Sequence, residues 1–292
     1  MKLIDEKKVT SGMKGRIFRN SLFKNIFLLA TLLCLLFLIV LFWRILSQGL
    51  AYLDWQFLNS LPSRKPEKAG IYTALNGTLW MMAVVVPVTM ILGIGTAIYL
   101  EEYAKKNKFT TFIQVNISNL AGVPSVVYGL LGLTIFVRAL NLGTSVLAAG
   151  LTMSLLILPV VIVSAQEAIR AVPNSLREAS YGMGATKWQT ILNVVLPAAL
   201  PGILTGTILA LSRAIGETAP LVVLGIPLYL AFLPTSFLDE FTALPMQIYN
   251  WTSRPQAEFQ NLAAAGIIVL LAILIIMNSV AILIRNKFQK KY

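Results

Sequence analysis

Two charged residues, Arg213 and Glu217, lie inside a long apolar run of this chain. A charge near the centre of a membrane-spanning helix costs about 2.5–3.5 kcal/mol on insertion scales and usually marks a functional position. Arginine presents a planar, forked set of donors that suits a tetrahedral oxyanion. The spacing of four residues places both side chains on one helix face, where they can pair. The residues therefore indicate either a path for an anion or a structural ion pair that locks this helix against a neighbour.

The carboxylate of Glu217 bears on which anion could pass. A fully deprotonated anion such as sulfate would be repelled by it, whereas hydrogen phosphate still has a hydroxyl that can donate a hydrogen bond to a carboxylate. Our hypothesis is therefore that the pair suits phosphate better than sulfate. On this hypothesis, Glu217→Gln relaxes the discrimination against sulfate.

A second candidate site is the polar stretch 170–197, which lies between two apolar runs. Residues 175–178 and 186–189 each have the pattern of a capping box, in which a Ser or Thr side chain and a Glu or Gln side chain satisfy the first amides of a helix. Gly184 suits a chain reversal that needs a positive φ. The stretch predicts a helix, a tight turn and a second helix.

The second helix of this stretch is expected to be amphipathic. Its apolar residues recur at i, i+3, i+4 and i+7, and they are Trp188, Ile191, Leu192 and Val195. Pro197 is expected to end or bend this helix. Small residues that we expect to be exposed, which would let another surface approach closely, are Ala179, Gly182, Gly184 and Ala185. The stretch is either a docking surface or only a folded connector.

The elements that must position these residues are helices in a membrane. The chain is 57% hydrophobic and 12% charged, whereas a soluble domain has about 25% charged residues. A membrane span needs about 20 apolar residues, and six runs qualify: 26–43, 79–100, 117–137, 142–166, 196–225 and 262–284. We predict an all-α, polytopic membrane protein with six transmembrane helices. Prolines inside the third and fourth runs are expected to produce kinks, or to serve gating.

Other function classes are excluded or disfavoured by composition. The chain has no histidine and one cysteine, Cys34, so it lacks the commonest metal ligand and acid–base catalyst, and a metal site is not expected. It also lacks a Walker-type glycine loop followed by Lys-Ser/Thr. We expect no enzyme activity, no cofactor bound by this chain and no nucleic-acid binding.

The distribution of Lys and Arg predicts the orientation in the membrane. With the N-terminus inside, 17 of the 24 basic residues fall in inside segments and 6 in outside segments. Basic residues favour the cytoplasmic side, so both termini are expected in the cytoplasm. We divide the chain into a cytoplasmic basic tail (1–24), a first transmembrane helix (25–47), an external loop (48–78) and a core with the other five helices (79–292). The first run is too long for a signal peptide and is kept as an uncleaved span.

The stretch 170–197 resembles a known signature. Glu178-Ala179-Ser180, three residues, Gly184, nine residues and then Val-Val-Leu-Pro at 194–197 is similar to the pattern of ABC-importer permease subunits, with Ser180 in place of the more usual second Ala and Val194 in place of the more usual Ile. This resemblance implies a type I permease fold and a loop whose two short helices sit in a cleft of a separate ATPase. The residues that would contact the ATPase are Glu178, Ala179, Gly184 and Trp188.

Three further segments resemble the phosphate-specific, PstA-type branch of this family. They are GVPSVVYGLLGL (122–133), RAIGETAPL (213–221) and ALPMQIYNW (243–251). The resemblance covers most of the chain, from the second run to the C-terminus. It implies a permease subunit of an ATP-driven phosphate importer in the cytoplasmic membrane. The partners it implies are a related second permease chain, two ATPase subunits that bind ATP and Mg²⁺, and an external phosphate-binding protein.

Two alternatives to a phosphate importer remain open at this point. A permease for another oxyanion, such as sulfate or molybdate, is disfavoured by the Arg213–Glu217 pair and by the resemblance. A stand-alone secondary transporter or channel would be expected to show an inverted repeat and more polar groups at membrane depth, and it would leave the stretch 170–197 unexplained. The external segment 226–261 reads as interfacial, with Tyr249 and Trp251 at headgroup depth, and the resemblance suggests that it also receives the binding protein.

Overall fold

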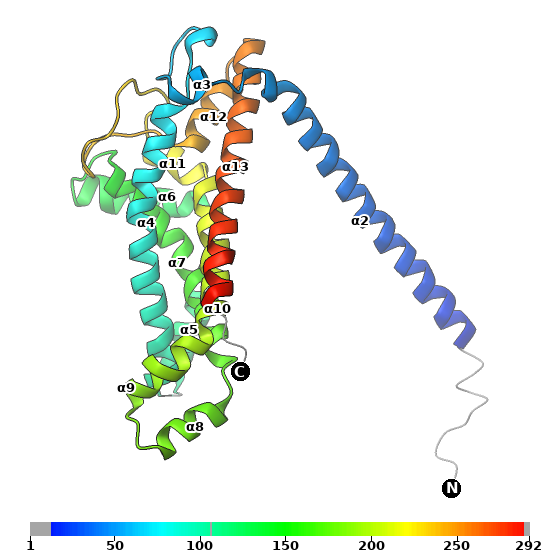
Figure 1. The fold of residues 1–292 in the computed structure, drawn as a ribbon, viewed down its shortest axis with the longest axis vertical. Coiled ribbons are helices and arrows are strands. Elements are labelled where there is room, and N and C mark those ends of the chain that lie inside the picture. Colours follow the sequence, from blue (N-terminus) through cyan, green and yellow to red (C-terminus); the bar gives the residue numbers. More distant parts are fainter. Residues whose placement is uncertain (1–12, 106, 289–292) are drawn as a thin grey trace. The chain divides into compact units, whose positions relative to one another are not determined.

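The computed structural model describes residues 13–105 and 107–288, and these residues are mostly helical (Figure 1). The chain divides into two compact units, residues 1–48 and 49–292. Six of the basic residues used to predict the membrane orientation lie outside the described residues: Lys2, Lys7, Lys8, Lys106, Lys290 and Lys291. Of the expected tail 1–24, residues 1–12 also lie outside the described residues, and residues 13–24 form the start of the first helix.

The described part of the first unit is helical and belongs to α2 (Met13–Gly49), whose last residue lies in the second unit. It contains the expected run 26–43 and extends beyond it at both ends. Its central stretch is apolar on all sides of the helix, which is the pattern of a helix surrounded by lipid or by other apolar helices. A first transmembrane helix is consistent with its length and composition.

The second unit is built on long helices that lie side by side (Figure 1). These helices are α4 (Tyr72–Ile98), α7 (Val146–Arg170), α10 (Leu196–Gly216) and α13 (Ala257–Phe288). Helix α7 packs against both α4 and α10, and α10 packs against α13. Glycines allow close approach, because a Cβ at Gly150 of α7 would lie 2.6 Å from Val84 Cβ of α4. Small residues at such crossings are typical of helix packing in membranes.

The third apolar run does not form one straight span. Helix α5 (Lys108–Leu120) is followed by α6 (Ser125–Gly132) and its π-helical continuation η4 (Leu133–Ala139), with a bend of 103° between them. The expected single helix 117–137 is therefore wrong. Pro124 explains the break, because it removes an amide donor and disfavours helical backbone at the residue before it. The hydroxyl of Tyr128 donates to the Leu120 carbonyl (2.8 Å) and ties α6 to the end of α5.

The fifth apolar run also differs from its expected bounds, 196–225. Helix α9 (Lys187–Thr190) continues through the π-helical turn η5 (Ile191–Val195) into α10, so one helical segment runs from residue 187 to 216. The chain then leaves the helix at Glu217 and forms the short helix α11 (Ala219–Leu224). Pro197 does not end the helical segment, which continues to residue 216 after the wider turn η5 directly before this proline.

Among the described residues, five helices are long and apolar enough to cross a membrane, and the bent α5–α6 pair makes a sixth if it counts as one span. This agrees with the predicted all-α architecture of six transmembrane segments. The segment 48–78, expected to be irregular, holds η1 (Leu50–Tyr52), α3 (Trp55–Asn59), η2 (Pro66–Lys68) and the first turns of α4.

The ends of α4 and α7 remote from the 170–197 stretch are covered by the connection from α11 to α12 (Leu244–Thr252). The amide of Leu147 donates to the Phe237 carbonyl (2.8 Å), and the Phe237 ring packs edge-on against Trp80. Trp251 of α12 is fully buried and packs against Phe57, so the expectation that it lies at an interface is wrong. Tyr249 is exposed, as an interfacial residue would be.

Candidate functional site

The stretch 170–197, called here the 170–197 segment, forms a helix, a tight turn and a second helix, as expected. The first helix is α8 (Asn174–Gly182) and the second is α9. The turn between them contains Gly184 with φ +84°, a left-handed conformation that glycine adopts without a steric penalty. The capping box at 186–189 is present: Gln189 Oε1 accepts from the amide of Thr186 (2.8 Å), and Thr186 Oγ1 accepts from that of Gln189 (3.3 Å).

The expected capping box at 175–178 is absent from α8, which the structure describes in full. The helix begins at Asn174, directly after Pro173, and no side chain caps it. Ser175 is therefore the second residue of the helix rather than the residue before it, and a cap must precede the first helical residue. Pro173 moves the start of the helix forward, because its fixed φ suits entry into a helix.

The residues expected to contact an ATPase are exposed. Glu178 and Ala179 lie on the open side of α8, Gly184 is in the turn, and Trp188 of α9 has 55% of its surface exposed. Met183, between them, is 82% exposed. Ala185, expected to be exposed, is only partly so. The 170–197 segment thus presents exposed apolar and small side chains at one end of the bundle, which is typical of an interaction surface.

The apolar face predicted for the second helix separates into two. Ile191 and Val195 are buried at 1% exposure each, whereas Trp188 and Leu192 are exposed. The π-helical turn η5 explains the separation, because its i→i+5 hydrogen bonds widen the turn. Residues four apart then lie on the same side of the helix. Ile191 and Val195 face the core, and Trp188 and Leu192 face outward.

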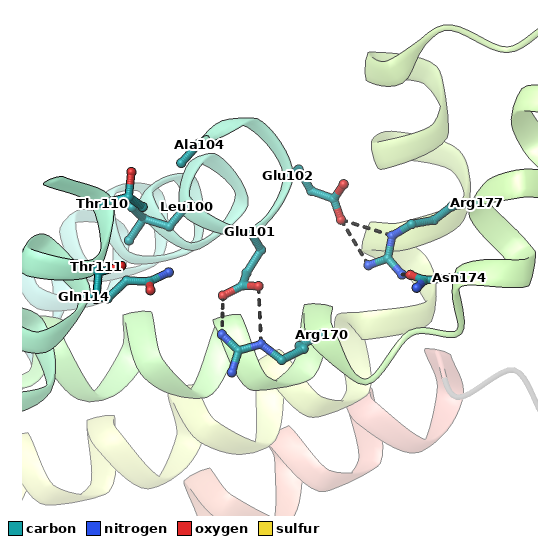
Figure 2. A pocket seen from close by; sticks show the side chains of 10 residues that line it. All are labelled: Leu100, Glu101, Glu102, Ala104, Thr110, Thr111, Gln114, Arg170, Asn174 and Arg177. Atoms are coloured by element: carbon teal, nitrogen blue, oxygen red, sulfur yellow. Dashed lines mark hydrogen bonds and ion pairs between the residues drawn. The ribbon is translucent and has the colours of Figure 1, made fainter. Parts of the chain in front are cut away.

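Side-chain contacts join the 170–197 segment to the far end of α4. Helix α4 ends in the π-helical turn η3 (Tyr99–Tyr103), whose carboxylates meet two arginines (Figure 2). Glu102 lies 3.0 Å from Arg177 of α8, and Glu101 lies 2.6 Å from Arg170 at the end of α7. Arg170 donates to the Glu101 carboxylate from Nη2 (2.6 Å) and from Nε (3.4 Å).

These two ion pairs line a cavity of about 610 Å³ between η3, α5 and α8 (Figure 2). Sequence reasoning used Arg170 and Arg177 only for the membrane orientation and did not find the pairs. One signal in the sequence could have suggested the pairs. Two acidic residues, Glu101 and Glu102, follow the apolar run 79–100, and two basic residues, Arg170 and Arg177, follow the run 142–166. Partners 69 and 75 residues apart leave no periodic pattern.

The second candidate site, Arg213 and Glu217, is brought together as expected. Arg213 Nε donates to Glu217 Oε1 over 3.1 Å. Arg213 lies in the last turn of α10 rather than near the centre of a helix, and Glu217 is the extended residue that follows. The arginine side chain is 43% exposed and the glutamate 21%.

The position of Arg213 has a structural cause and a chemical consequence. Pro220 lacks the amide that would pair with the Gly216 carbonyl in a longer helix, and it disfavours helical backbone at the residue before it, so α10 ends close to Arg213. A cation is stabilised at a helix C-terminus. Because Arg213 is only singly bonded to Glu217 among the contacts of the described residues, its other donors remain available for an anion.

The two sites lie at different levels of the bundle. Both belong to the continuous helical segment 187–216, with Trp188 in its first turn and Arg213 in its last. At about 1.5 Å per residue, the 25 positions between them correspond to about 38 Å along the helix axis. The structure therefore does not bring the two sites together, but it connects them through one helix.

Comparison with known proteins gives a consistent assignment. The sequence profile of the family described as "Binding-protein-dependent transport system inner membrane component" matches residues 89–290. The phosphate transport system permease protein PstA 1 of Mycobacterium tuberculosis (strain CDC 1551 / Oshkosh) is 35% identical over 282 residues, which cover 92% of this chain and 90% of that protein. The probable ABC transporter permease protein YqgI of Bacillus subtilis (strain 168) is 31% identical, with 87% and 90% covered.

A solved structure shows the same fold. The bacterial alginate ABC transporter in complex with an alginate pentasaccharide-bound periplasmic protein contains a chain that aligns with a TM-score of 0.65 at 16% identity, covering 94% of this chain and 98% of that one. This likeness concerns the fold alone. Together with the family match and the relatives, it confirms the predicted fold class and the predicted resemblance. The chain therefore belongs to the family of binding-protein-dependent transport system inner-membrane components, the permease subunits of ABC transporters.

Proposed function

We propose that this chain is the permease subunit of an ATP-driven importer of inorganic phosphate. The observation that carries the proposal is the 35% identity to a phosphate transport permease across about nine-tenths of both chains. The Arg213–Glu217 pair supports it, because an arginine donor beside a carboxylate suits an anion that still carries a hydroxyl. The chain itself carries no ATP-binding loop, so we assign ATP and Mg²⁺ to a separate subunit.

The 170–197 segment is proposed as the surface on which the ATPase docks. Its exposed residues Glu178, Ala179, Gly184 and Trp188 would contact the ATPase, and a Cβ at Gly184 would meet nothing within 4 Å on this chain. The open space beside the turn supports close approach of a partner. ATP binding and hydrolysis would move this segment and switch the path from outward-open to inward-open.

The complete transporter is proposed to contain a second, related permease chain, two ATPase subunits and an external phosphate-binding protein. The binding protein would release phosphate at the external end, and phosphate would pass Arg213. We place the protein in the cytoplasmic (inner) membrane with both termini in the cytoplasm, which the excess of Lys and Arg in the alternate connections supports. The 170–197 segment is then on the cytoplasmic side.

Radiolabelled phosphate uptake tests the proposal in cells that produce the chain with its partners. Uptake by the wild type should resist excess sulfate, and Arg213→Ala should abolish it while the amount of assembled complex stays normal. Arg138→Ala, at an exposed arginine of η4, is the matched control and should transport normally. Uptake that survives Arg213→Ala would make Arg213 structural, and inhibition by sulfate would assign a broader oxyanion specificity.

A further inference from the structure

Three consecutive residues at the end of α4 each contact a different part of the 170–197 segment and its root. Glu101 pairs with Arg170 at the end of α7, Glu102 pairs with Arg177 of α8, and the ring of Tyr103 lies beneath Lys187 Nζ of α9, 4.9 Å from its centroid. We call this set of contacts the clasp. It joins elements that are otherwise far apart in the sequence.

The π-helical turn η3 makes the clasp possible. The amide of Ala104 donates to the Tyr99 carbonyl over 2.8 Å, which is the i→i+5 bond of a widened turn. Such single turns are frequently found at functional sites. Helix η3 places Glu101 and Glu102 at the point where α7 ends and α8 begins (Figure 2).

The centre of the clasp is the pair Glu102–Arg177, which is largely withdrawn from solvent. The two side chains are 9% and 15% exposed. Arg177 also donates to the carbonyls of Ile169 (2.9 Å) and Val172 (2.6 Å), at the point where α7 ends. One guanidinium therefore fixes the end of α7, the start of α8 and the end of α4 relative to one another.

Helix α8 has little else to hold it. Within α8, which is described in full, the buried residue is Ser180, and its contact is also polar: its hydroxyl lies 2.9 Å from that of Thr190 in α9. Leu176 is only partly buried against the neighbouring apolar cluster. Because hydrophobic burial is small here, the polar contacts of Arg177 determine how firmly α8 is attached.

We infer that Glu102 and Arg177 are positioning residues for energy coupling: they attach the ATPase-docking surface to α4, so that its movement is carried into the helix that packs along α7. The inference rests on the proposed function, because it assumes that an ATPase moves the 170–197 segment. It adds α4 as a second route for that movement, beside the continuous segment 187–216. Neither residue is proposed to contact substrate or ATPase.

The test uses the complete transporter, with its partner subunits and binding protein, in proteoliposomes. Phosphate uptake and ATP hydrolysis are measured on the same vesicles for the wild type, Glu102→Gln and Arg177→Lys. Both variants keep the size of the side chain, but the first removes the negative charge and the second removes the planar fork. The matched control is Glu167→Gln, because the Glu167–Arg170 pair lies within α7 and joins no two elements.

Glu102→Gln and Arg177→Lys should lower the phosphate transported per ATP hydrolysed by about fivefold or more, the lower end of typical coupling between sites. The amount of assembled complex and its ATP hydrolysis should persist, and Glu167→Gln should match the wild type. An unchanged ratio would overturn the inference. So would a parallel loss of transport and hydrolysis that follows the amount of complex, since that would indicate a merely structural role.

A second measurement keeps the two proposals separate. Hydrogen exchange of the α8 amides in the assembled complex does not depend on which substrate is transported. Faster exchange in Glu102→Gln than in Glu167→Gln supports the clasp, and equal exchange overturns it. A wild-type complex that shows the protected α8 amides but no ATP-dependent phosphate uptake would contradict the proposed function and not the clasp.

Discussion

The packing of α7 against α10 predicts the outcome of exchanging two small residues. A Cβ added at Gly202 of α10 would lie 2.7 Å from the Cβ of Ala168 in α7 and 3.5 Å from its Cα. The first distance is too short for two carbon atoms, and the second is an ordinary contact. Gly202→Ala should therefore push the two helices apart, and overpacking of this kind costs about 1–3 kcal/mol.

The compensating change is Ala168→Gly, which removes the Cβ that the new methyl group would strike. Alone it should cost about 0.5–1 kcal/mol, because glycine is a poorer helix former than alanine. In the double variant the new methyl group meets only the Cα of residue 168, and the gain of alanine in α10 offsets the glycine in α7. The double variant should therefore return to within about 0.5 kcal/mol of the wild type, the usual error of additivity.

Thermal unfolding of the purified protein in detergent measures these differences. Gly95→Ala in α4 is the control, because a Cβ there meets nothing within 4 Å, and it should unfold at or slightly above the wild-type temperature. If the double variant is no more stable than Gly202→Ala, the steric argument is wrong. Equal stability of Gly202→Ala and Gly95→Ala would also refute the close approach of α7 and α10.

Three further predictions concern the connections between helices. Gly184→Ala should destabilise the 170–197 segment by about 1–2 kcal/mol because Gly184 has φ +84°. Gly182→Ala should not destabilise it, because a Cβ at Gly182 of α8 meets nothing within 4 Å. Hydrogen exchange of the α8 amides distinguishes the two variants. Ser180→Ala should cost about 1–3 kcal/mol by leaving the buried hydroxyl of Thr190 without its partner, and Ser180→Thr at the same position tests whether a hydroxyl suffices. The pKa of Asp239 is lowered by hydrogen bonds from the amide and hydroxyl of Thr235 and the amide of Ser236, so its stabilising effect is present above the usual aspartate pKa and lost as the pH falls through the lowered value. The protection of the 235–239 amides against exchange, relative to the intrinsic rate at each pH, should fall in acid in the wild type and stay constant with pH in Asp239→Asn.

The long helices were predictable because lipid imposes one requirement on every span. A run of about 20 apolar residues must satisfy its backbone within the helix, so the runs at 79–100, 142–166 and 262–284 correspond to α4, α7 and α13. The breaks were less predictable. The proline of the third run, Pro124, is expected only to kink a span and Pro197 to end or bend a helix, yet the chain bends sharply beside the first and continues through the second.

The candidate site was predictable where local chemistry decides it. The turn at Gly184 and the capping box at 186–189 depend on a few neighbouring residues, and both are present. The clasp depends on tertiary packing, which brings Glu102 and Arg177 together across 75 residues. The exposure of Trp188 depends on the π-helical turn that follows it, and a regular helical period gives no indication of such a turn. The roles of Arg213 and Glu217 in transport, and of the exposed 170–197 residues in docking, stay predictions.

The continuity of residues 187–216 gives this part of the chain the mechanics of a lever. The axis of these thirty helical residues is about 45 Å long at about 1.5 Å per residue, and a rotation of about 5° over that length corresponds to a displacement of about 4 Å. A small rotation imposed on Trp188 would therefore reach Arg213 as a displacement comparable to the size of a phosphate ion. The backbone hydrogen bonding of this segment changes at the widened turn 191–195. The stiffness of that turn decides how much of the rotation is transmitted to Arg213.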